Sequence, residues 1–307
     1  MIKLLIDFSK FDNGPAVFRG RIARAISSNF NNIKVVNHAK DGFDIELSII
    51  RCLNKHSKPR ILRLDGCYYK KNQTGPNEEI KRAVKQSHTV VYQSEASRLM
   101  IKDVIGINPK SYQVIPNGIS FSEVESIAPS PKIESGSFVS VAKWRDNKRP
   151  MSTIKGFLEA DTGRHLYMIG SGIKDRNWKN VHILGKKGPN EIISIMKACQ
   201  YQMHLCQIDS CPNAVVEGLA CGLNILCTNL GGTPELVKNN GVVINVDKWH
   251  DRKHRPENCD PSDNVNPSIV AQGIHDLLNL KERSVRTDVN INYIAEQYVK
   301  LVENILS

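Results

Sequence analysis

The sequence lacks any long apolar run. The longest are strand-length, such as Ile2 to Ile6, and the chain does not open on a basic segment followed by an apolar one. A membrane-spanning helix needs about 20 mostly apolar residues, and a secretory signal needs that basic-then-apolar order. We therefore expect no transmembrane segment and no export, and predict a cytoplasmic protein.

Closely paired cysteines are also missing. None of the eight cysteines has a partner at the two-residue spacing of a zinc knuckle or a redox motif, and most lie within apolar segments. This pattern favours reduced thiols in a cytoplasm-like compartment.

Acidic residues are in the minority. The chain has 42 Lys and Arg against 31 Asp and Glu, a formal net charge of +11 and a pI near 9.2. Such an excess favours anionic partners, whether nucleotide phosphates, lipid headgroups or nucleic acid, and does not choose among them. A solvated basic surface without a partner is the alternative.

Apolar residues are plentiful, and they recur in short strand-like and helix-like runs. With 307 residues, 40% of them apolar, the chain is long enough for two domains. Strand and helix in alternation indicate parallel strands joined by crossover helices. We expect an α/β fold with two Rossmann-like domains, whose parallel sheets face one another across a cleft and bind ligands at the carboxyl ends of their strands. The expected strands are 2–7, 32–36, 60–64, 89–92, 138–142, 165–169, 181–184, 202–205 and 224–228, and the expected helices are 15–27, 78–85, 95–104, 150–159, 189–199 and 214–221.

Composition suggests where the domains divide. Residues 1–118 form the first domain, and 119–136, rich in Ser, Pro and Glu without a visible period, form a linker. Residues 137–287 form the second domain. Residues 288–307 carry apolar side chains at helical spacing, which predicts an amphipathic terminal helix.

Two acids eight residues apart mark the stretch DSCPNAVVEGLACG, from Asp209 to Gly222. Pro212 suits the first position of a helix capped by Ser210 or Cys211. The backbone N–H groups that open the helix would then form an anion site, supplied by Asn213, Ala214 and Val215.

Glu217 lies about 7 to 8 Å further along that helix. This is about the offset between a nucleotide's diphosphate and its ribose, so Glu217 would accept the ribose hydroxyls. Asp209 would lie beside a sugar attached to the diphosphate. The alternative is that Asp209 caps the helix and Glu217 is an exposed helix acid.

Two lysines lie in the loop AKWRDNKRP, which directly follows an expected strand. Lys143 and Lys148 would converge on one diphosphate and stabilise the charge that grows there as the bond to the sugar breaks. No metal would then be required. A solvated loop is the alternative.

These motifs together resemble a known family, the retaining glycosyltransferases of family 4, or glycosyl transferases group 1, which have the GT-B fold. The stretch from Asp209 to Glu217 resembles the family's E-x7-E motif, and Lys143 with Lys148 resembles its R-x4-K. Further similarity lies in VIPNGIS, LYMIGSG, VHILGKKGPNEIISIMKAC, the GG-x-PE of NILCTNLGGTPELV, and the N-terminal DFSKFDNGPAVFRGRIARAI with Gly14.

The resemblance implies a nucleotide-sugar donor held mainly by the second domain, with a UDP- or GDP-sugar as co-substrate and no cofactor. It assigns the diphosphate to Lys143 and Lys148, the ribose to Glu217, and the hydroxyls of the transferred sugar to Asp209. In this family the departing phosphate is usually held to take the acceptor's proton, which removes the need for a separate base.

Three further assignments come from the same resemblance. Gly14 would give the donor phosphates close approach to the backbone. Leu184, Gly185 and Lys186 would meet the base. Asp65, at the end of a first-domain strand, would face the anomeric carbon.

The chain departs from the family's pattern in three places. Asp209 is one methylene shorter than the usual Glu, and Lys143 replaces an Arg and loses its bidentate fork. The first domain is also short for the family, which leaves the acceptor hardest to infer.

The segment from Lys248 to Pro267 has no counterpart in the family pattern. Its first eight residues hold four Lys or Arg and two His, which suit an anionic acceptor such as nucleic acid or a phosphorylated lipid or glycan. A zinc site formed by His250, His254 and Cys259 is a further alternative. A solvated insertion is the simpler alternative.

Two other functions stay open at this point. One is a nucleotide-sugar epimerase of the same architecture, which would act on its donor without an acceptor. The other is a nucleic-acid-binding protein that kept the fold, or that uses nucleic acid as the glycosylated acceptor.

Overall fold

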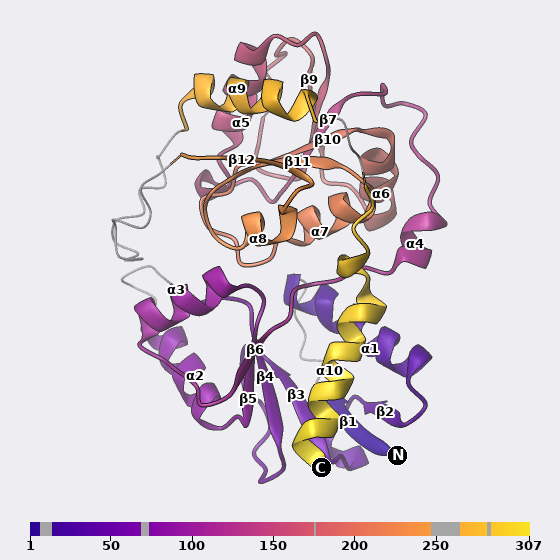
Figure 1. The fold of residues 1–307 in the computed structure, drawn as a ribbon, viewed down its shortest axis with the longest axis vertical. Coiled ribbons are helices and arrows are strands. Elements are labelled where there is room, and N and C mark those ends of the chain that lie inside the picture. Colours follow the sequence, from indigo (N-terminus) through magenta and orange to yellow (C-terminus); the bar gives the residue numbers. More distant parts are fainter. Residues whose placement is uncertain (7–13, 69–73, 175, 247–264, 281–283) are drawn as a thin grey trace. The chain divides into compact units, whose positions relative to one another are not determined.

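A computed structural model describes residues 1–6, 14–68, 74–174, 176–246, 265–280 and 284–307 (Figure 1). The chain divides into two compact units. Unit 1 contains Met1–Ser120 and Asp288–Ser307, and unit 2 contains Phe121–Trp249 and Cys259–Thr287. Each unit is built on one six-stranded sheet whose paired strands are all parallel, as the alternating pattern predicts. None of the described helices is long and apolar enough to cross a membrane.

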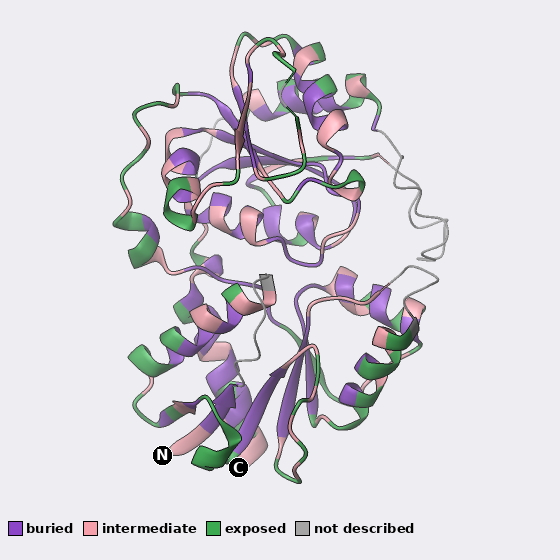
Figure 2. Cartoon of the chain, turned by 180° about the vertical axis from the view of Figure 1, so that it is seen from behind, coloured by how far each residue is buried: buried purple, intermediate pink, exposed green. Residues whose placement is uncertain are grey.

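Unit 1 has the strand order β2-β1-β3-β4-β5-β6. The strands of this sheet are largely buried (Figure 2). Their apolar side chains enter two core clusters, with Ile61 in one and Leu62 and Leu64 in the other. Helix α3 shows how local signals set its ends, because Ser94 accepts the N–H of Ser97 at its start and left-handed Gly106 ends it. The elements are β1 (Ile2–Ile6), α1 (Gly14–Asn29), β2 (Ile33–Val36), β3 (Ile45–Ile49), β4 (Arg60–Leu64), α2 (Thr74–Lys85), β5 (Thr89–Tyr92), α3 (Glu95–Ile105) and β6 (Tyr112–Val114).

The terminal helix α10 (Ile291–Leu306) belongs to unit 1. Its apolar face packs on α1, where the rings of Tyr298 and Phe18 lie 5.9 Å apart between centroids (Figure 1). The predicted amphipathic helix is confirmed, and it completes a core built mostly from residues far away in the sequence.

Unit 2 has the strand order β9-β8-β7-β10-β11-β12. Its first strand, β7, therefore lies between β8 and β10, and the order reverses direction at the β7–β10 pair. In open parallel sheets such a reversal point is where ligands bind, outside the carboxyl ends of the strands. The elements are α4 (Phe121–Glu125), β7 (Phe138–Val141), α5 (Pro150–Ala160), β8 (Leu166–Ile169), β9 (Val181–Gly185), α6 (Pro189–Ala198), β10 (Tyr201–His204), α7 (Asn213–Ala220), β11 (Asn224–Thr228), α8 (Thr233–Val237), β12 (Gly241–Ile244) and α9 (Pro267–Leu278).

The segment predicted as a linker, 119–136, carries α4 and packs against α6 in unit 2. The ammonium of Lys197 donates to the carbonyl oxygens of Val124, Glu125 and Ile127. The hydroxyl of Ser194 donates to the carbonyl of Ala128, so side chains of α6 hydrogen-bond to backbone oxygens along this segment. The segment rich in serine and proline therefore has an irregular backbone that is held in place by hydrogen bonds to α6.

Candidate functional site

The candidate site lies at the carboxyl ends of β7 and β10, the neighbouring strands at which the order of the unit 2 sheet reverses. Lys143 and Lys148 follow β7, and Asp209 follows β10. The backbone N–H of Gln207 donates to the carbonyl of Asn147 at 2.8 Å, which ties the two loops together. This bond brings the lysine loop next to Asp209.

Lys148 and Asp209 form an ion pair. The ammonium of Lys148 donates to Oδ2 of Asp209 at 2.6 Å, and the two side chains are only 16% and 22% exposed. In so shielded a pair the mutual attraction is offset by the cost of taking both charges out of water, but removing one partner leaves an uncompensated buried charge. Lys143, by contrast, is exposed and makes no ion pair or hydrogen bond with the part of the chain that is described.

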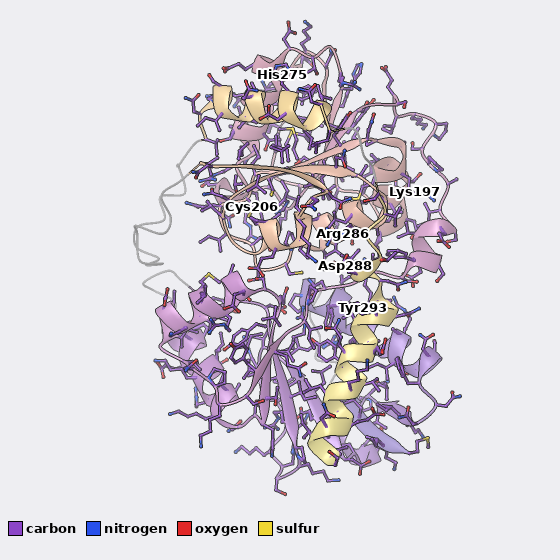
Figure 3. All side chains as sticks on the ribbon, in the orientation of Figure 1. Lys197, Cys206, His275, Arg286, Asp288 and Tyr293 are labelled. Atoms are coloured by element: carbon purple, nitrogen blue, oxygen red, sulfur yellow. The ribbon has the colours of Figure 1, made fainter. Side chains whose placement is uncertain are left out.

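His204 and Cys206 complete the surroundings of Asp209, and the sequence analysis missed both. The Nε2 atom of His204, whose side chain is 6% exposed, lies 3.6 Å from Oδ2 of Asp209. Cys206, labelled in Figure 3, is 3% exposed and directs its thiol toward the carbonyl of Ile208 at 3.1 Å. The available signal was the spacing H-x-C after a strand, since alternate residues of extended chain share a face.

The electrostatics of this cluster are dominated by burial and by opposite charges. Burial alone raises the pKa of the Asp209 carboxyl, but Lys148 and His204 outweigh it and hold that pKa well below its usual range. Burial also lowers the pKa of His204, and Asp209 and Cys206 outweigh this and raise it. For Cys206, Lys148 and His204 overcome the effect of burial and lower the pKa of the thiol.

Gly231 fixes the backbone of Asp209 from the other side. The N–H of Gly232 donates to the carbonyl oxygen of Asp209 at 2.8 Å. Gly231 has a φ of +65°, and a Cβ there would lie 2.4 Å from the same oxygen. Only glycine permits this approach. The paired glycines of the GG-x-PE motif therefore support Asp209.

Helix α7 begins at Asn213, one residue before the expected range 214–221 and one residue after Pro212, which was predicted to be its first residue. Pro212 is its N-cap, in extended conformation and without a side-chain cap hydrogen bond, so the prediction that Ser210 or Cys211 is the N-cap is wrong. The N–H of Val215 already donates to the carbonyl of Pro212 at 3.0 Å.

The remaining candidates on α7 keep their predicted places along the helix. Asn213 and Ala214 lie in its first turn, and Glu217 follows in the next, half-buried. The side-chain amide of Gln202 in β10 donates to the carbonyl of Ala214 at 2.9 Å, which holds the start of α7 against the sheet.

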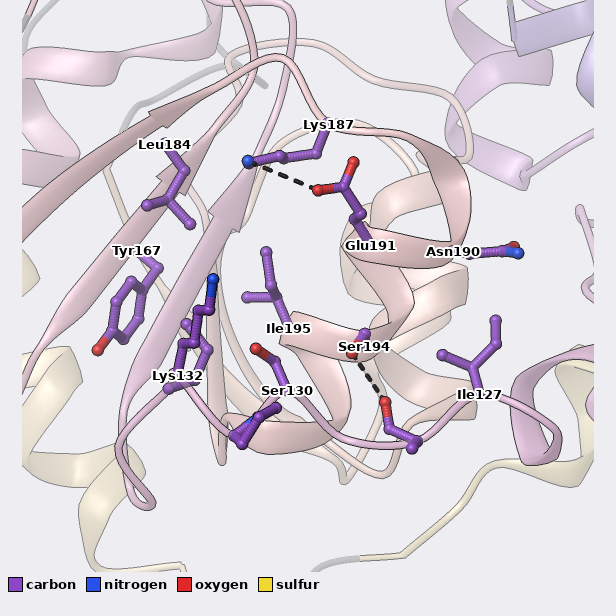
Figure 4. A pocket seen from close by; sticks show the side chains of 13 residues that line it. Ile127, Ser130, Lys132, Tyr167, Leu184, Lys187, Asn190, Glu191, Ser194 and Ile195 are labelled. Atoms are coloured by element: carbon purple, nitrogen blue, oxygen red, sulfur yellow. Dashed lines mark hydrogen bonds and ion pairs between the residues drawn. The ribbon is translucent and has the colours of Figure 1, made fainter.

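The predicted base contacts lie at the end of β9. Gly185 ends that strand with a φ of +66°, and Lys186 is exposed. Leu184 lines a pocket of 640 Å³ between β8, β9, α6 and the 127–133 segment (Figure 4). The polar residues that line this pocket include Lys187, whose ammonium lies 3.6 Å from the carboxylate of Glu191.

Two predicted residues lie in unit 1. Gly14 is the first residue of α1. Asp65 follows β4, where its carboxylate accepts hydrogen bonds from Arg63 and from Gln93. The guanidinium of Arg63 also donates to Asn117, so Asp65 belongs to a polar cluster at the carboxyl ends of β4, β5 and β6.

The basic segment from Lys248 falls almost entirely outside the described residues. This includes His250, His254 and Cys259, and the four basic residues predicted to meet an anionic acceptor. Both hypotheses stay predictions from the sequence.

Comparison with known proteins connects this geometry to a family. Residues 156–255 match the family "Glycosyl transferases group 1". A curated relative, the uncharacterized glycosyltransferase MJ1178 of Methanocaldococcus jannaschii, is 25% identical over 95 residues, which cover 30% of this chain and 27% of that protein.

Solved structures extend the likeness to the whole chain. Anabaena Alr3699/HepE, solved with UDP, has a TM-score of 0.65 at 14% identity and covers 99% of this chain and 100% of its own. Sucrose-phosphate synthase from Thermosynechococcus elongatus has a TM-score of 0.67 at 10% identity and covers 100% of this chain and 99% of its own. The chain therefore has the GT-B fold, and its residues 156–255 are similar to the glycosyl transferases group 1 family.

Proposed function

We propose that this protein is a retaining glycosyltransferase that moves a sugar from a nucleoside-diphosphate sugar to an acceptor hydroxyl without a metal ion. The observation that carries the proposal is the Lys148–Asp209 pair at the reversal point of the unit 2 sheet. A cation and a carboxylate in contact there match the two halves of such a donor, an anionic diphosphate and a hydroxyl-rich sugar. A structure of Anabaena Alr3699/HepE with UDP-glucose makes a UDP-sugar the first donor to test.

In this proposal, donor binding separates the ion pair. The diphosphate offers Lys148 a stronger anionic partner, and the exposed Lys143 adds a second cation from the same loop. Asp209 is then free to accept hydrogen bonds from hydroxyls of the transferred sugar. Each side chain exchanges one charged or polar partner for another, so neither is left buried and unsatisfied.

The rest of unit 2 would hold the nucleotide. Glu217 accepts the ribose hydroxyls, and Gly185 and Lys186 contact the base. At the start of α7, Asn213 and Ala214 present their backbone N–H groups to the diphosphate.

The transfer step needs no separate base in this scheme. The bond between the anomeric carbon and the phosphate oxygen breaks, and the acceptor oxygen bonds to that carbon on the same face. The acceptor's proton passes to the departing phosphate oxygen, whose growing charge the lysines stabilise. Roles for Gly14 on the donor phosphates and Asp65 near the anomeric carbon stay predictions of the family resemblance.

Donor recognition is tested by comparing two carboxylates. Glu217→Gln should weaken UDP and the intact UDP-sugar alike in titration calorimetry, because both carry the ribose. Asp209→Asn should weaken the sugar-bearing donor or its turnover much more than UDP. Equal effects of Asp209→Asn on both ligands would show that Asp209 does not contact the sugar.

Four further measurements separate this proposal from its alternatives. Titration of UDP, GDP and ADP identifies the base, and the anomeric configuration of the product, read by NMR, distinguishes retention from inversion. Activity that survives EDTA supports a metal-free reaction. Donor consumption that is complete without any acceptor would instead favour an epimerase or a hydrolase.

The acceptor is proposed only as a class, an anionic molecule such as nucleic acid or a phosphorylated lipid or glycan. The proposal depends on the net charge and the basic segment from Lys248. Turnover that falls steeply with salt would support it, and a flat salt profile would contradict it.

The glycine support of Asp209 leads to a separate prediction. Gly231→Ala should lower kcat/KM for the donor sharply, because the new Cβ must displace the backbone of Asp209. A misplacement of 1 Å in a catalytic constellation costs roughly 100-fold.

The matched control for this change is Gly163→Ala. Gly163 also has a positive φ, +72°, but nothing lies within 4 Å of an added Cβ. It should lose stability to backbone strain and retain its activity. Equal activity losses in the two folded variants would show that contact with Asp209 is not the cause.

A further inference from the structure

The cluster beside Lys148 has the composition of a metal site. A ring nitrogen of His204, the sulfur of Cys206 and a carboxylate oxygen of Asp209 all lie within 4.8 Å of one another. The Nε2 atom of His204 is buried without a hydrogen-bond partner among the described residues, and it lies on the side of Asp209. A buried polar atom in that state is costly and suggests a partner that the cluster can accept.

The spacing H-x-C-x-x-D produces this arrangement locally. His204 ends β10, and Cys206 lies two residues further along the chain with its sulfur close to the His204 ring. The chain then turns back so that Asp209 lies beside both, and the bond between Gly232 and the Asp209 carbonyl holds the turn. All three donors therefore come from one rigid connection.

We propose that His204, Cys206 and Asp209 form a binding site for a thiophilic divalent cation, Zn²⁺ foremost, which competes with Lys148 for Asp209. Imidazole, thiolate and carboxylate together are typical zinc ligands, and three protein ligands leave a fourth position open. The ligand atoms of a tetrahedral zinc site lie about 3.3 to 3.8 Å apart, given bonds of about 2.0 to 2.3 Å. A shift of about 1 Å would bring these groups to that spacing.

Binding would require Lys148 to leave. Its ammonium now holds Oδ2 of Asp209 at 2.6 Å, so Lys148 acts as the cation of this cluster. A zinc ion would take that carboxylate and the thiolate, and the proton of the Cys206 thiol would pass to solvent. Hard cations such as Mg²⁺, which prefer oxygen ligands, would bind poorly.

If the proposed function holds, zinc bound at this site inhibits the enzyme. Only this inhibitory role, and not the metal site itself, depends on the proposed function. Zinc on Asp209 would block the sugar hydroxyls, while a bound donor would occupy the same carboxylate. Zinc and donor should therefore exclude one another.

Cobalt spectroscopy of the full-length protein tests the site without any donor. We expect Co²⁺ to give a sulfur-to-cobalt charge-transfer band and the intense visible bands of tetrahedral coordination, both removed by Zn²⁺. Cys206→Ser should abolish the charge-transfer band, and His204→Asn should weaken Co²⁺ binding at least tenfold. The control Cys199→Ser, at a buried cysteine after α6, should leave the band unchanged.

The Lys148→Ala variant gives the most specific test of the site. Removal of the competing ammonium should raise the affinity for Co²⁺ and Zn²⁺ at least tenfold, whereas a metal bound elsewhere would not respond. A band that persists in Cys206→Ser would place the metal at another site, such as the segment from Lys248, and overturn the proposal. Absence of the band in both wild type and Lys148→Ala would overturn it as well.

Addition of UDP-sugar separates the two proposals. Loss of the cobalt band on addition of donor supports the site together with its inhibitory role. A normal band that ignores the donor supports the site and contradicts only the link to the proposed function.

Discussion

Lys148→Ala is expected to lower kcat/KM for the donor by roughly 100- to 1,000-fold, the usual effect of removing one group that stabilises developing charge. Lys148 is the buried cation next to Asp209, so its loss also leaves that carboxylate without its ion-pair partner. Steady-state kinetics with a UDP-sugar measures the effect, and circular dichroism verifies the fold.

Two other lysines provide the comparison. Lys143→Ala should lower kcat/KM for the donor by about tenfold or more, since one charged hydrogen bond is worth about 1.5 to 3 kcal/mol and Lys143 is exposed. Lys179→Ala should behave like wild type, because Lys179 and its partner Asp161 are 74% and 76% exposed. A folded Lys148→Ala enzyme with normal kinetics would remove the central element of the proposed function.

Glu46→Ala is expected to lower the free energy of unfolding by about 3 to 5 kcal/mol, the cost of breaking a buried ion pair on one side. The Glu46 carboxylate is fully buried in β3 and accepts from Arg60 at 2.7 Å and from Asn54 at 3.0 Å, and its other neighbour is His56 at 2.5 Å. Its removal would strand the guanidinium of Arg60, which is 3% exposed. Chemical denaturation followed by fluorescence measures the change.

The surface pair of Arg51 and Glu79 serves as the control. Their side chains are 43% and 45% exposed, so Glu79→Ala should cost no more than about 1 kcal/mol. Equal losses in Glu46→Ala and Glu79→Ala would show that the buried cluster contributes nothing beyond a surface pair.

The same cluster has a defined pH dependence. Burial alone raises the pKa of the Glu46 carboxyl, but Asn54, His56 and Arg60 outweigh it, so the pKa in the folded protein lies below its ordinary value of 4.5. The stabilisation is therefore present above pH 4.5 and is lost as the pH falls through the folded-state pKa. The difference in stability between wild type and Glu46→Gln should shrink on acidification.

Glu46 also shows where sequence reasoning fell short for the fold. The alternation in IELSI is typical of a half-buried strand with its polar side chains exposed. No strand was predicted at 45–49, and in the structure the polar Glu46 and Ser48 are buried as well. Hydrogen bonds and opposite charge from Arg60, His56 and Asn54 offset the free-energy cost of burying the Glu46 carboxylate. Such compensation depends on tertiary contacts, which periodicity does not record.

Helix α9 was missed for a different reason. Its residues, 267–278, directly follow the polar segment from Lys248, whose composition dominated the interpretation of that region. Strands with continuous apolar runs, such as β5 and β11, were placed correctly because burial on both faces is visible in the sequence itself.

For the candidate site, the sequence located the loops but not their contacts. Lys148 was expected in a loop after a strand and Asp209 just before a helix. The structure pairs them where the bond between Gln207 and Asn147 joins the two loops. That backbone bond has no signature in residue spacing, and the H-x-C spacing of His204 and Cys206 does not show that they lie beside Asp209. The order of the strands, which makes β7 and β10 neighbours, had to be known first.

The membership of α10 in unit 1 constrains how the protein is made. The hydrophobic core around Leu4 and Phe18 includes Ile294, Tyr298 and Val302, which a ribosome adds nearly three hundred residues after the first strand. During synthesis, unit 1 must wait with that core open while unit 2 is translated. A nascent chain that stops before Ile291 exposes the apolar surface of α1 to chaperones and proteases. Whether these factors bind the chain would therefore depend on whether α10 has been added.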